Sequence, residues 1–439
     1  MSDDRMRPLR VLEIETFGRG GLIHYAFNLS GALADRGHEV DLVTAECYEL
    51  AGRNLPTGVR LHTPIGRFAR WFDAWPVTVA SLGRKIEAVL DARAVARLAR
   101  RMRPEIIHLH NTNTSAVVYL SLLRRLGLPL VATAHVVTPH ERIALQDAVY
   151  RRIHTLPDLV IAHSEIDRKR LHTEFGIAAE SIEVIPHGDY SFFADVAEPP
   201  ERGAARARLG LGGDEPVALF FGFLREYKGL DVLLDAWPEV VTAVPDARLV
   251  IAGDPVRLSA DRRDEFRRRA DEAGALHRFE YIPFDEVGGF FAAADVLVLP
   301  YRQISQSGVL YLALAAGVPV VATAVGAWPE MLSDGENALL VPPGSPTELA
   351  SALARVLGDS ELRSRLAVGG RRVAASHSWP AVAKQTEQAF GFLRARLSPS
   401  ELEEPSLEPR RSALEPPEDG QNRHEDGSPD DDGADQRRP

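Results

Sequence analysis

The sequence predicts an α/β fold in which two tandem Rossmann-like domains face a central cleft. Apolar runs of strand length alternate with helical patterns from Leu9 to His187, and a second alternation of the same kind begins at Pro216. The stretch Asp295–Thr323 shows the repeating unit, because a strand, a polar loop, an apolar helix and a second strand follow one another. Units of this kind build parallel sheets, whose ligand sites lie beyond the carboxyl ends of the strands.

The first domain, assigned to residues 1–190, opens with a strand over Leu9–Phe17 and a glycine-rich turn at residues 18–21. The helix after the turn repeats apolar residues at helical spacing and ends at Gly37. The turn lacks the G-x-G-x-x-G spacing of dinucleotide sites, so it is either a tight turn or a backbone that a ligand can approach closely. Further strands are expected at Glu39–Thr44, Glu105–His110, Pro129–His135, Asp158–Ser164 and Ser181–His187, with helices near 114–126, 141–155 and 165–175.

The second domain, assigned to residues 191–380, follows a charged linker with a short helix. Ser307 stands at the N-cap of one of its helices, Gly308 opens that helix, and Gly317 ends it in the left-handed conformation. A final helix over residues 381–397 is expected to return to the first domain. Strands are expected at Val217–Leu224, Arg248–Gly253, Phe279–Phe284, Asp295–Pro300 and Val318–Thr323, with helices near 229–243, 259–274, 285–294, 308–316, 347–357 and 360–375.

The composition excludes several classes of protein. Of the 439 residues 45% are hydrophobic, and no run approaches the ~20 apolar residues that a membrane-spanning helix needs. The single cysteine, Cys47, excludes an intramolecular disulfide framework, and the N-terminus lacks an apolar signal core, so a cytoplasmic location is expected. Residues 398–439 carry 13 acidic residues and 5 arginines, which predicts a disordered acidic tail, with a specific interaction tail as the alternative. The rest of the chain is not strongly basic, which disfavours a nucleic acid partner.

Residues 67–103 are more basic than their surroundings, with nine Arg or Lys side chains against three acidic ones. Such a segment either rests on anionic lipid headgroups or is an amphipathic helix with a solvated basic face. The first alternative motivates a location at the inner face of the plasma membrane. Aromatic residues at the start and an apolar helical stripe complete the pattern: Trp71, Phe72 and Trp75, then Ile86, Leu90, Ala94, Leu98 and Met102.

Two cationic residues, Arg225 and Lys228, follow the first strand of the second domain, just before a helix at the carboxyl edge of the sheet. Two positive charges beside a helix N-terminus make a good seat for a diphosphate. The alternative is a surface turn with ordinary charged side chains. The helix start at Ser307–Val309 belongs to the same sheet edge, and this favours the diphosphate site.

The order and spacing of several motifs, each of them weak alone, carry a family resemblance. The second domain contains F-G-F-L-R-E-Y-K-G-L-D from residue 221, R-L-V-I-A-G-D from 248, F-E-Y-I-P-F from 279, A-A-A-D-V-L-V-L-P from 292 and A-A-G-V-P-V-V-A-T from 315. The first domain contains G-R-G-G-L-I-H-Y from residue 18, I-I-H-L-H from 106, L-V-A-T-A-H from 130 and V-I-P-H-G from 184. Together they resemble the retaining GT-B glycosyltransferases of family 4, also called glycosyltransferase group 1, along about 380 residues.

The resemblance implies that a nucleotide sugar binds to the second domain and an acceptor to the first. Lys228 and Arg225 match the cationic turn on the diphosphate. Ser307, Gly308 and Val309 match the helix start whose N–H groups meet the same diphosphate.

Further residues match the loops around the donor. Gly253-Asp254 and Tyr281-Ile282 match the loops at the nucleoside, where backbone groups read the base. Gly20 and Gly21 match the glycine-rich loop near the donor phosphates and the acceptor. His135 matches a histidine near the reacting sugar, although a histidine at a strand end is more often structural when it is considered alone.

The sequence departs from the family pattern in the helical unit around the diphosphate. The family usually carries two glutamates eight residues apart there, and these places hold Ile304 and Leu312. The turn between them reads Gln306-Ser307-Gly308, which resembles a Q-S-G variant within the family. Gln306 is therefore the first candidate for contacting the sugar in place of the first glutamate.

We therefore expect a hexosyltransferase of polysaccharide or cell-envelope biosynthesis that moves a sugar from a nucleotide diphospho-sugar to a glycan, lipid-linked or small-molecule acceptor with retention. No Asp-x-Asp motif is placed to hold a metal and no Cys/His cluster has zinc spacing, so neither a metal nor another cofactor is expected. Two alternatives stay open: a non-catalytic sugar-nucleotide-binding protein, because both glutamates are absent, and a GT-B sugar-nucleotide epimerase.

Overall fold

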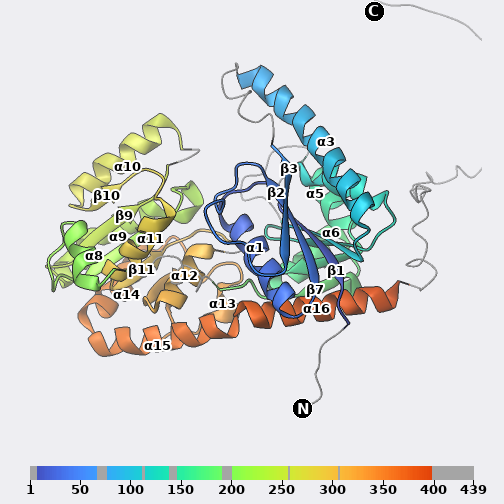
Figure 1. The fold of residues 1–439 in the computed structure, drawn as a ribbon. Coiled ribbons are helices and arrows are strands. Elements are labelled where there is room, and N and C mark those ends of the chain that lie inside the picture. Colours follow the sequence, from blue (N-terminus) through green and yellow to red (C-terminus); the bar gives the residue numbers. More distant parts are fainter. Residues whose placement is uncertain are drawn as a thin grey trace, which may run out of the picture.

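The structure, a computed structural model, describes residues 7–66, 77–110, 114–137, 146–189, 200–255, 258–304 and 307–397. Two parallel sheets lie side by side, each covered by helices (Figure 1). Two of the four hydrophobic clusters contain strand residues of the first sheet, and the other two contain strand residues of the second. This pairing of clusters is the arrangement expected for strands that are buried on both faces.

The N-terminal sheet has seven strands in the order β3-β2-β1-β4-β5-β6-β7, and all neighbours are parallel. The order reverses between β1 and β4, which is the switch point where open α/β sheets bind ligands. The strands are β1 (Arg10–Ile14), β2 (Glu39–Ala45), β3 (Val59–Ile65), β4 (Ile106–Leu109), β5 (Leu130–Thr133), β6 (Leu159–Ala162) and β7 (Ile182–Val184). The helices are α1 (Gly21–Asp35), α3 (Val77–Met102), α4 (Ala116–Arg124), α5 (Gln146–Thr155) and α6 (Glu165–Phe175).

The C-terminal sheet has six parallel strands in the order β10-β9-β8-β11-β12-β13, with its switch point between β8 and β11. The strands are β8 (Val217–Phe221), β9 (Arg248–Ala252), β10 (Leu276–Arg278), β11 (Val296–Leu299), β12 (Val320–Thr323) and β13 (Leu339–Val341). The helices are α8 (Arg202–Arg208), α9 (Leu230–Ala243), α10 (Ala260–Glu272), α11 (Phe284–Ala293), α12 (Gly308–Ala316), α13 (Trp328–Met331), α14 (Pro346–Gly358), α15 (Ser360–Ser376) and α16 (Trp379–Arg396).

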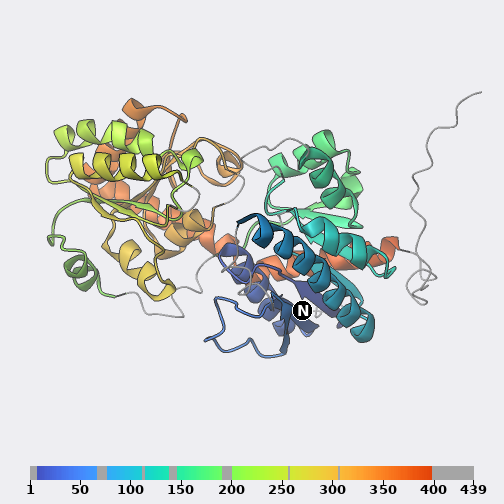
Figure 2. The ribbon, with the colours of Figure 1, turned by 90° about the horizontal axis from the view of Figure 1, so that it is seen from above.

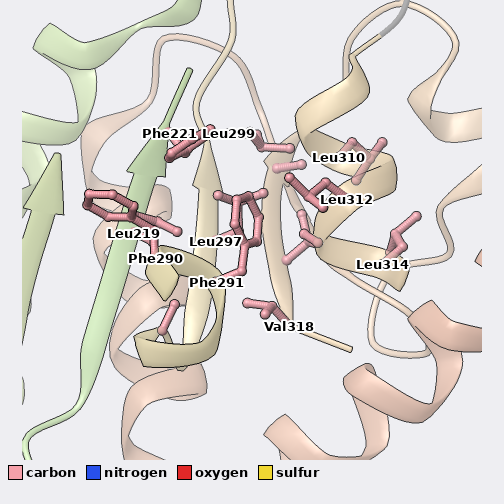
Figure 3. Close-up of a cluster of buried hydrophobic side chains, with 14 of the residues drawn as sticks. Leu219, Phe221, Phe290, Phe291, Leu297, Leu299, Leu310, Leu312, Leu314 and Val318 are labelled. Atoms are coloured by element: carbon pink, nitrogen blue, oxygen red, sulfur yellow. The ribbon is translucent and has the colours of Figure 1, made fainter. Parts of the chain in front are cut away.

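Helix α12 is buried against the C-terminal sheet because nearly all of its side chains are apolar. Leu310 and Leu312 of α12 belong to the same core cluster as Leu297 and Leu299 of β11 (Figure 3). The helix ends at Gly317, which has a φ of 68° and the left-handed conformation. The sequence prediction for this helix is confirmed, and its fixed position determines where its N-terminus lies.

Helix α16 follows the C-terminal domain in sequence but packs against α1 of the N-terminal domain (Figures 1 and 2). Its Trp379 and Phe390 join a hydrophobic cluster with residues of α1. Trp379 Nε1 also donates a hydrogen bond to the backbone oxygen of Asp189 at 3.1 Å. Arg36, the C-cap residue of α1, also contacts α16, because its Nε donates a hydrogen bond to Glu387 Oε2 at 2.6 Å.

The structure corrects some of the elements expected from the sequence. The strand expected at Phe279–Phe284 is wrong, because β10 already ends at Arg278 and Pro283 is the N-cap of α11. Within the described residues, strand β10 pairs only with β9, and it stops at Arg278 because its partner Ala252 is the last residue of β9. Three elements were missed, namely the edge strands β3 and β13 and the single-turn helix α13, which are short or carry polar residues on exposed positions.

The apolar stripe expected on α3 is also only partly buried. Ile86 and Leu90 are 54% and 43% exposed, whereas Glu87 and Asp91 are buried. Asp91 Oδ2 accepts a hydrogen bond from the amide of Gly66 at 3.1 Å, and this contact helps to turn the acidic edge of the helix inward. The aromatic start of the segment, residues 67–76, and the acidic tail lie outside the described residues. Within the described ranges, every helix is too short or too polar to cross a bilayer.

Candidate active site

Lys228 lies just beyond the carboxyl end of β8, in a 3₁₀ turn over Glu226–Lys228 that leads into α9. Its side chain is buried, and its Nζ atom lies 5.2 Å from the centre of the Tyr301 ring. Burial lowers the pKa of Lys228 to about 8. A Cβ atom added to Gly222 would lie 3.0 Å from Lys228 Nζ and 3.1 Å from a methyl group of Val309. The lysine and the start of α12, which the sequence placed on one sheet edge, therefore meet at Gly222.

The N-terminus of α12 faces the same point. Ser307 occupies the N-cap in an extended conformation, but its side chain makes no capping hydrogen bond. Its backbone oxygen accepts a hydrogen bond from the amide of Leu310 at 3.1 Å. The amides of Gly308 and Val309 belong to the first turn, which has no intrahelical acceptors. These amides and the helix dipole favour an anion beside Lys228.

The loops after β8 and β9 are held against each other, and this brings the cationic turn beside the predicted nucleoside loop. Gly253 has a φ of 155°, and a Cβ atom there would lie 2.0 Å from the backbone oxygen of Gly222. The amide of Leu224 donates to the backbone oxygen of Asp254 at 2.8 Å. Arg225 follows directly and is half-buried. Only glycine at position 253 permits this close approach.

Tyr281 reaches across to the N-terminal domain and forms a contact that we call the cleft clasp, made of Tyr281, Glu49 and Gly20. The hydroxyl of Tyr281 donates to Glu49 Oε1 at 2.6 Å, and Glu49 Oε2 accepts from the amide of Gly20 at 2.8 Å. Gly20 precedes Gly21, the first residue of α1, and has a φ of 68°. The side chain of Ile282 is buried in the core, so only its backbone is available at the sheet edge. Sequence reasoning missed Glu49 because a single glutamate in a loop carries no signal.

Four imidazoles surround Tyr25 of α1 at the carboxyl ends of the N-terminal strands. This histidine cluster consists of His110, His135, His163 and His187, which follow β4, β5, β6 and β7 respectively. Their ring centres lie 5.3, 4.6, 5.4 and 4.9 Å from that of Tyr25. Burial lowers all four pKa values, to about 4 for His110 and His187, to about 3 for His163, and well below the usual range for His135. The four rings are therefore neutral at pH 7.

The hydrogen bonds of His163 determine the tautomer of His135. His163 Nδ1 lies 2.9 Å from the backbone oxygen of Ile185, which can only accept, so the proton of His163 is on Nδ1. His163 Nε2 is then an acceptor, and His135 Nδ1, 3.0 Å away, donates to it. His135 Nε2 is left as an acceptor, and it has no hydrogen-bond partner among the described residues. A buried acceptor of this kind suits a hydroxyl group of a ligand.

A buried carboxylate, Glu13, lies behind the cluster. Glu13 Oε2 lies 3.0 Å from His108 Nδ1 and accepts a short hydrogen bond from His110 Nε2. Burial alone would raise the pKa of Glu13, but the two imidazoles outweigh burial and lower the pKa to about 2. Glu13 of β1 pairs in register with His108 of β4, so the carboxylate lies at the switch point of the sheet. The only sequence signal was a glutamate within an otherwise apolar strand.

A cavity of about 320 Å³ lies between the two domains, which we call the hinge cavity. Its wall includes His163 and Pro186 from the N-terminal domain and Tyr311 and His377 from the C-terminal domain. The ring of Tyr311, on α12, stacks on His187 with ring centres 5.2 Å apart. The helix at the predicted diphosphate site therefore contacts the histidine cluster.

A second contact between the domains caps helix α6. Glu330, on α13, accepts hydrogen bonds from the amides of Glu165 at 3.0 Å and Ile166 at 2.9 Å. These amides belong to the first turn of α6, where a carboxylate is favourable. Together with the cleft clasp, this cap holds the two domains in the observed arrangement.

The two places where the family usually has glutamates hold core residues. Ile304 and Leu312 are 7% and 8% exposed, and both join the core cluster of the C-terminal domain, where Figure 3 shows Leu312. Gln306, the predicted substitute for the first glutamate, lies outside the described residues.

Two Rossmann-like sheets joined by a returning C-terminal helix, here α16, are the architecture of GT-B glycosyltransferases. A model of Glycosyltransferase Family 4 matches residues 19–188, and a model of Glycosyl transferases group 1 matches residues 215–359. The D-inositol 3-phosphate glycosyltransferase of Acidothermus cellulolyticus is 30% identical over 390 residues, which cover 84% of this chain and 85% of that protein. The chain belongs to glycosyltransferase family 4, and it is a glycosyltransferase that uses a nucleotide sugar.

A further relative and two solved structures are also glycosyltransferase-like in sequence or fold. The D-inositol 3-phosphate glycosyltransferase of a Nocardioides species is 29% identical over 414 residues and covers 86% of each chain. Sucrose-phosphate synthase of Thermosynechococcus elongatus has a TM-score of 0.70 and 24% identity, covering 88% of this chain and 99% of that one. Anabaena HepE, solved in complex with UDP-glucose, has a TM-score of 0.68 and 20% identity, covering 87% and 99%. These structures confirm the predicted GT-B fold.

Proposed function

We propose that this protein transfers a hexose from a nucleotide diphospho-sugar to an acceptor with retention of anomeric configuration and without a metal ion. The observation that carries the proposal is the buried ammonium group of Lys228 beside the start of α12. The leaving diphosphate gains negative charge as the glycosidic bond breaks, and Lys228, Arg225 and the first-turn amides of α12 would stabilise that charge. These three sources of positive charge are the reason for proposing metal independence.

The donor that we propose is a uridine diphosphate hexose. The support is the complex of the structurally similar HepE with UDP-glucose. The nucleoside would meet the loop at Asp254, which is hydrogen-bonded to Leu224 beside the cationic turn, and the loop at Tyr281-Ile282. Gln306 remains the first candidate for contacting the sugar hydroxyls.

His135 would position the sugar rather than protonate it. Its Nε2 atom is an acceptor because its Nδ1 proton is donated to His163, so it can receive a hydrogen bond from a sugar hydroxyl near the reacting carbon. An oxygen of the leaving diphosphate would take the proton of the acceptor hydroxyl. Attack on the face that the diphosphate leaves gives retention.

Water must be excluded while the glycosidic bond is open, and the cleft clasp suits this task. Glu49 joins the loop of Tyr281 in one domain to the amide of Gly20 in the other. We propose that donor binding favours this closed arrangement, which protects the reacting sugar from hydrolysis.

The acceptor that we propose first is a phosphorylated polyol of the inositol phosphate class. The support is the naming of the relatives from Acidothermus and Nocardioides as D-inositol 3-phosphate glycosyltransferases. A cytoplasmic location suits such an acceptor.

A lipid-linked glycan is the second acceptor class, because α3 combines exposed apolar and basic residues. Ile86 and Leu90 are exposed, and Arg84, Lys85 and Arg93 beside them are exposed as well. Peripheral binding of this segment at the inner face of the plasma membrane follows if that class is right. Flotation with vesicles of anionic lipid tests it: binding that is lost in an Ile86→Asp, Leu90→Asp variant supports the lipid-linked class, and failure to float counts against it.

Thermal shift with UDP-, GDP- and ADP-hexoses, followed by transfer assays in EDTA, tests the proposed function. A bound donor raises the unfolding temperature by mass action. We expect the largest shift with a UDP-hexose, and product formation with D-inositol 3-phosphate in the presence of EDTA. Transfer that requires added metal, or no shift with any donor, contradicts the proposal.

A non-catalytic sugar-nucleotide binder is the second candidate function, because Ile304 and Leu312 replace both family glutamates. Isothermal titration that shows donor binding, with neither transfer nor donor hydrolysis across an acceptor panel, would favour it. Conversion of the donor sugar without any acceptor would instead indicate an epimerase.

A further inference from the structure

The three histidines that follow β5, β6 and β7 form a group of potential metal ligands. His135, His163 and His187 each offer one ring nitrogen, and the three nitrogens lie within 4.8 Å of one another. The three residues are 7%, 5% and 6% exposed. They stand far apart in sequence, so no spacing rule for metal sites could have found them; neighbouring parallel strands bring them to one edge.

Two of the three rings are held in the orientation that metal-binding histidines usually have. His163 Nδ1 donates to the backbone oxygen of Ile185 at 2.9 Å, and His187 Nδ1 donates to the backbone oxygen of Gly188 at 2.8 Å. A hydrogen bond from Nδ1 to a carbonyl fixes the tautomer and leaves the lone pair on Nε2. In both rings the lone pair is therefore on Nε2, and in His163 this nitrogen accepts the hydrogen bond from His135 Nδ1 at 3.0 Å.

The third ring, His135, supplies an independent sign of a ligand. Its side chain is more than nine-tenths buried, and its Nε2 has no hydrogen-bond partner among the described residues. Its Nδ1 donates to His163 Nε2 at 3.0 Å, so its own lone pair is on the unpartnered Nε2.

We propose that His135, His163 and His187 bind one divalent transition metal ion of the Zn²⁺ class, and that the bound ion inhibits glycosyl transfer. Three neutral imidazoles with an open fourth position suit Zn²⁺. Zn–N bonds of ~2.0–2.1 Å place tetrahedral ligands about 3.4 Å apart, so the rings need to close by about 1.4 Å at most. One of the three residues, His163, also lines the hinge cavity.

The group formed by Glu13, His108 and His110 is a weaker candidate. All three are fully buried, and the carboxylate already accepts hydrogen bonds from both rings. The carboxylate of that group is therefore satisfied without a cation, although His110 Nδ1 has no hydrogen-bond partner among the described residues.

The inhibitory part of the proposal rests on the proposed function, because His135 is the residue assigned to the donor sugar. An ion that binds either nitrogen of His135 removes that ring from the sugar or from His163, which holds its tautomer. The metal site itself does not depend on this assignment.

Isothermal titration of ZnCl2 into metal-free protein at pH 7.5 tests the site. We expect one Zn²⁺ per chain in the wild type, and an affinity at least tenfold weaker in His163→Gln and in His187→Gln. His172→Ala, which removes an exposed histidine of α6, is the matched control and should bind as the wild type does. Two cluster variants are used so that one misfolded variant does not decide the result, and thermal unfolding shows which are folded. No binding, or equal binding in the folded cluster variants, overturns the proposal.

Transfer assays with the same proteins test the inhibition. Zn²⁺ should inhibit the wild type and His172→Ala, saturating donor should protect, and EDTA should restore the rate. Binding with an unchanged transfer rate would keep the metal site but overturn both the inhibition and the assigned role of His135. If the protein shows no transfer at all, the proposed function fails while the titration still decides the metal site.

Discussion

Replacing Lys228 by Met removes the buried charge of the proposed donor site while it keeps a side chain of similar length. Burial lowers the pKa of Lys228 from 10.5 to about 8, which corresponds to about 3 kcal/mol against the charged form in the folded protein. Methionine carries no such cost, so we expect the free energy of unfolding to rise by about 1–3 kcal/mol near neutral pH. Because the pKa is lower in the folded state, the unfolded chain binds more protons between pH 8 and 10.5. The stability that Lys228→Met gains over the wild type is therefore full below pH 8 and disappears as the pH rises toward 10.5.

Activity should change in the opposite direction. The loss of one preorganised group at the leaving diphosphate typically costs on the order of 10²–10³ in rate, and we expect this loss in kcat/KM of Lys228→Met. In the wild type, kcat/KM for the donor should fall as the pH rises above about 8, where Lys228 loses its proton, and the variant should lack this fall. Urea unfolding and nucleotide-release kinetics measure both effects, with exposed Lys169→Met as the control. Transfer within a few-fold of the wild type would refute the assignment of the diphosphate site.

Three further predictions follow from the site. Tyr281→Phe removes one hydrogen bond of the cleft clasp, so the donor KM should rise about 3–10-fold with stability unchanged. Glu49→Gln should raise the donor KM as well. An unchanged KM in steady-state kinetics would argue against the clasp. Leu312→Glu places an unpaired carboxylate in the core cluster of Figure 3, so urea unfolding should show a loss of about 3–5 kcal/mol, and a stable variant would contradict the packing. Stability should fall as the pH decreases from 6.5 toward 4. The pKa values of the histidine cluster are lower in the folded protein, so the unfolded chain binds more protons than the folded protein in this pH range. Equal urea midpoints at pH 7.5 and pH 5 would contradict this prediction.

Much of the fold could be predicted because its signals are local. The apolar runs locate the long helices and most of the parallel strands, and Gly317 fixes the end of α12. The edges were less predictable, because an edge strand such as Val59–Ile65 buries only part of its side chains and its pattern is mixed. Ile86 and Leu90 show a related limit: helical periodicity identifies an apolar stripe, but the hydrogen bond from Gly66 to Asp91 helps to turn another face inward.

The candidate site shows the same division between local and distant signals. Lys228 and the Ser307–Val309 helix start lie in short motifs, so the sequence places both at one sheet edge and the structure brings them together at Gly222. The cleft clasp, the buried carboxylate of Glu13 and the histidine cluster depend on residues from several strands or from both domains. No sequence spacing joins such residues, and only the strand order and the packing of the domains show that they meet.

The most direct test of the central claim is the anomeric configuration of the product. The protein is incubated in EDTA with UDP-α-hexose and D-inositol 3-phosphate, and the coupling constant of the anomeric proton of the product is measured by NMR. Transfer on the face that the diphosphate leaves predicts the α-anomer, formed in EDTA by the wild type and by Lys169→Met but not at a comparable rate by Lys228→Met. A β-linked product, or an α-linked product formed equally well without Lys228, would contradict the account.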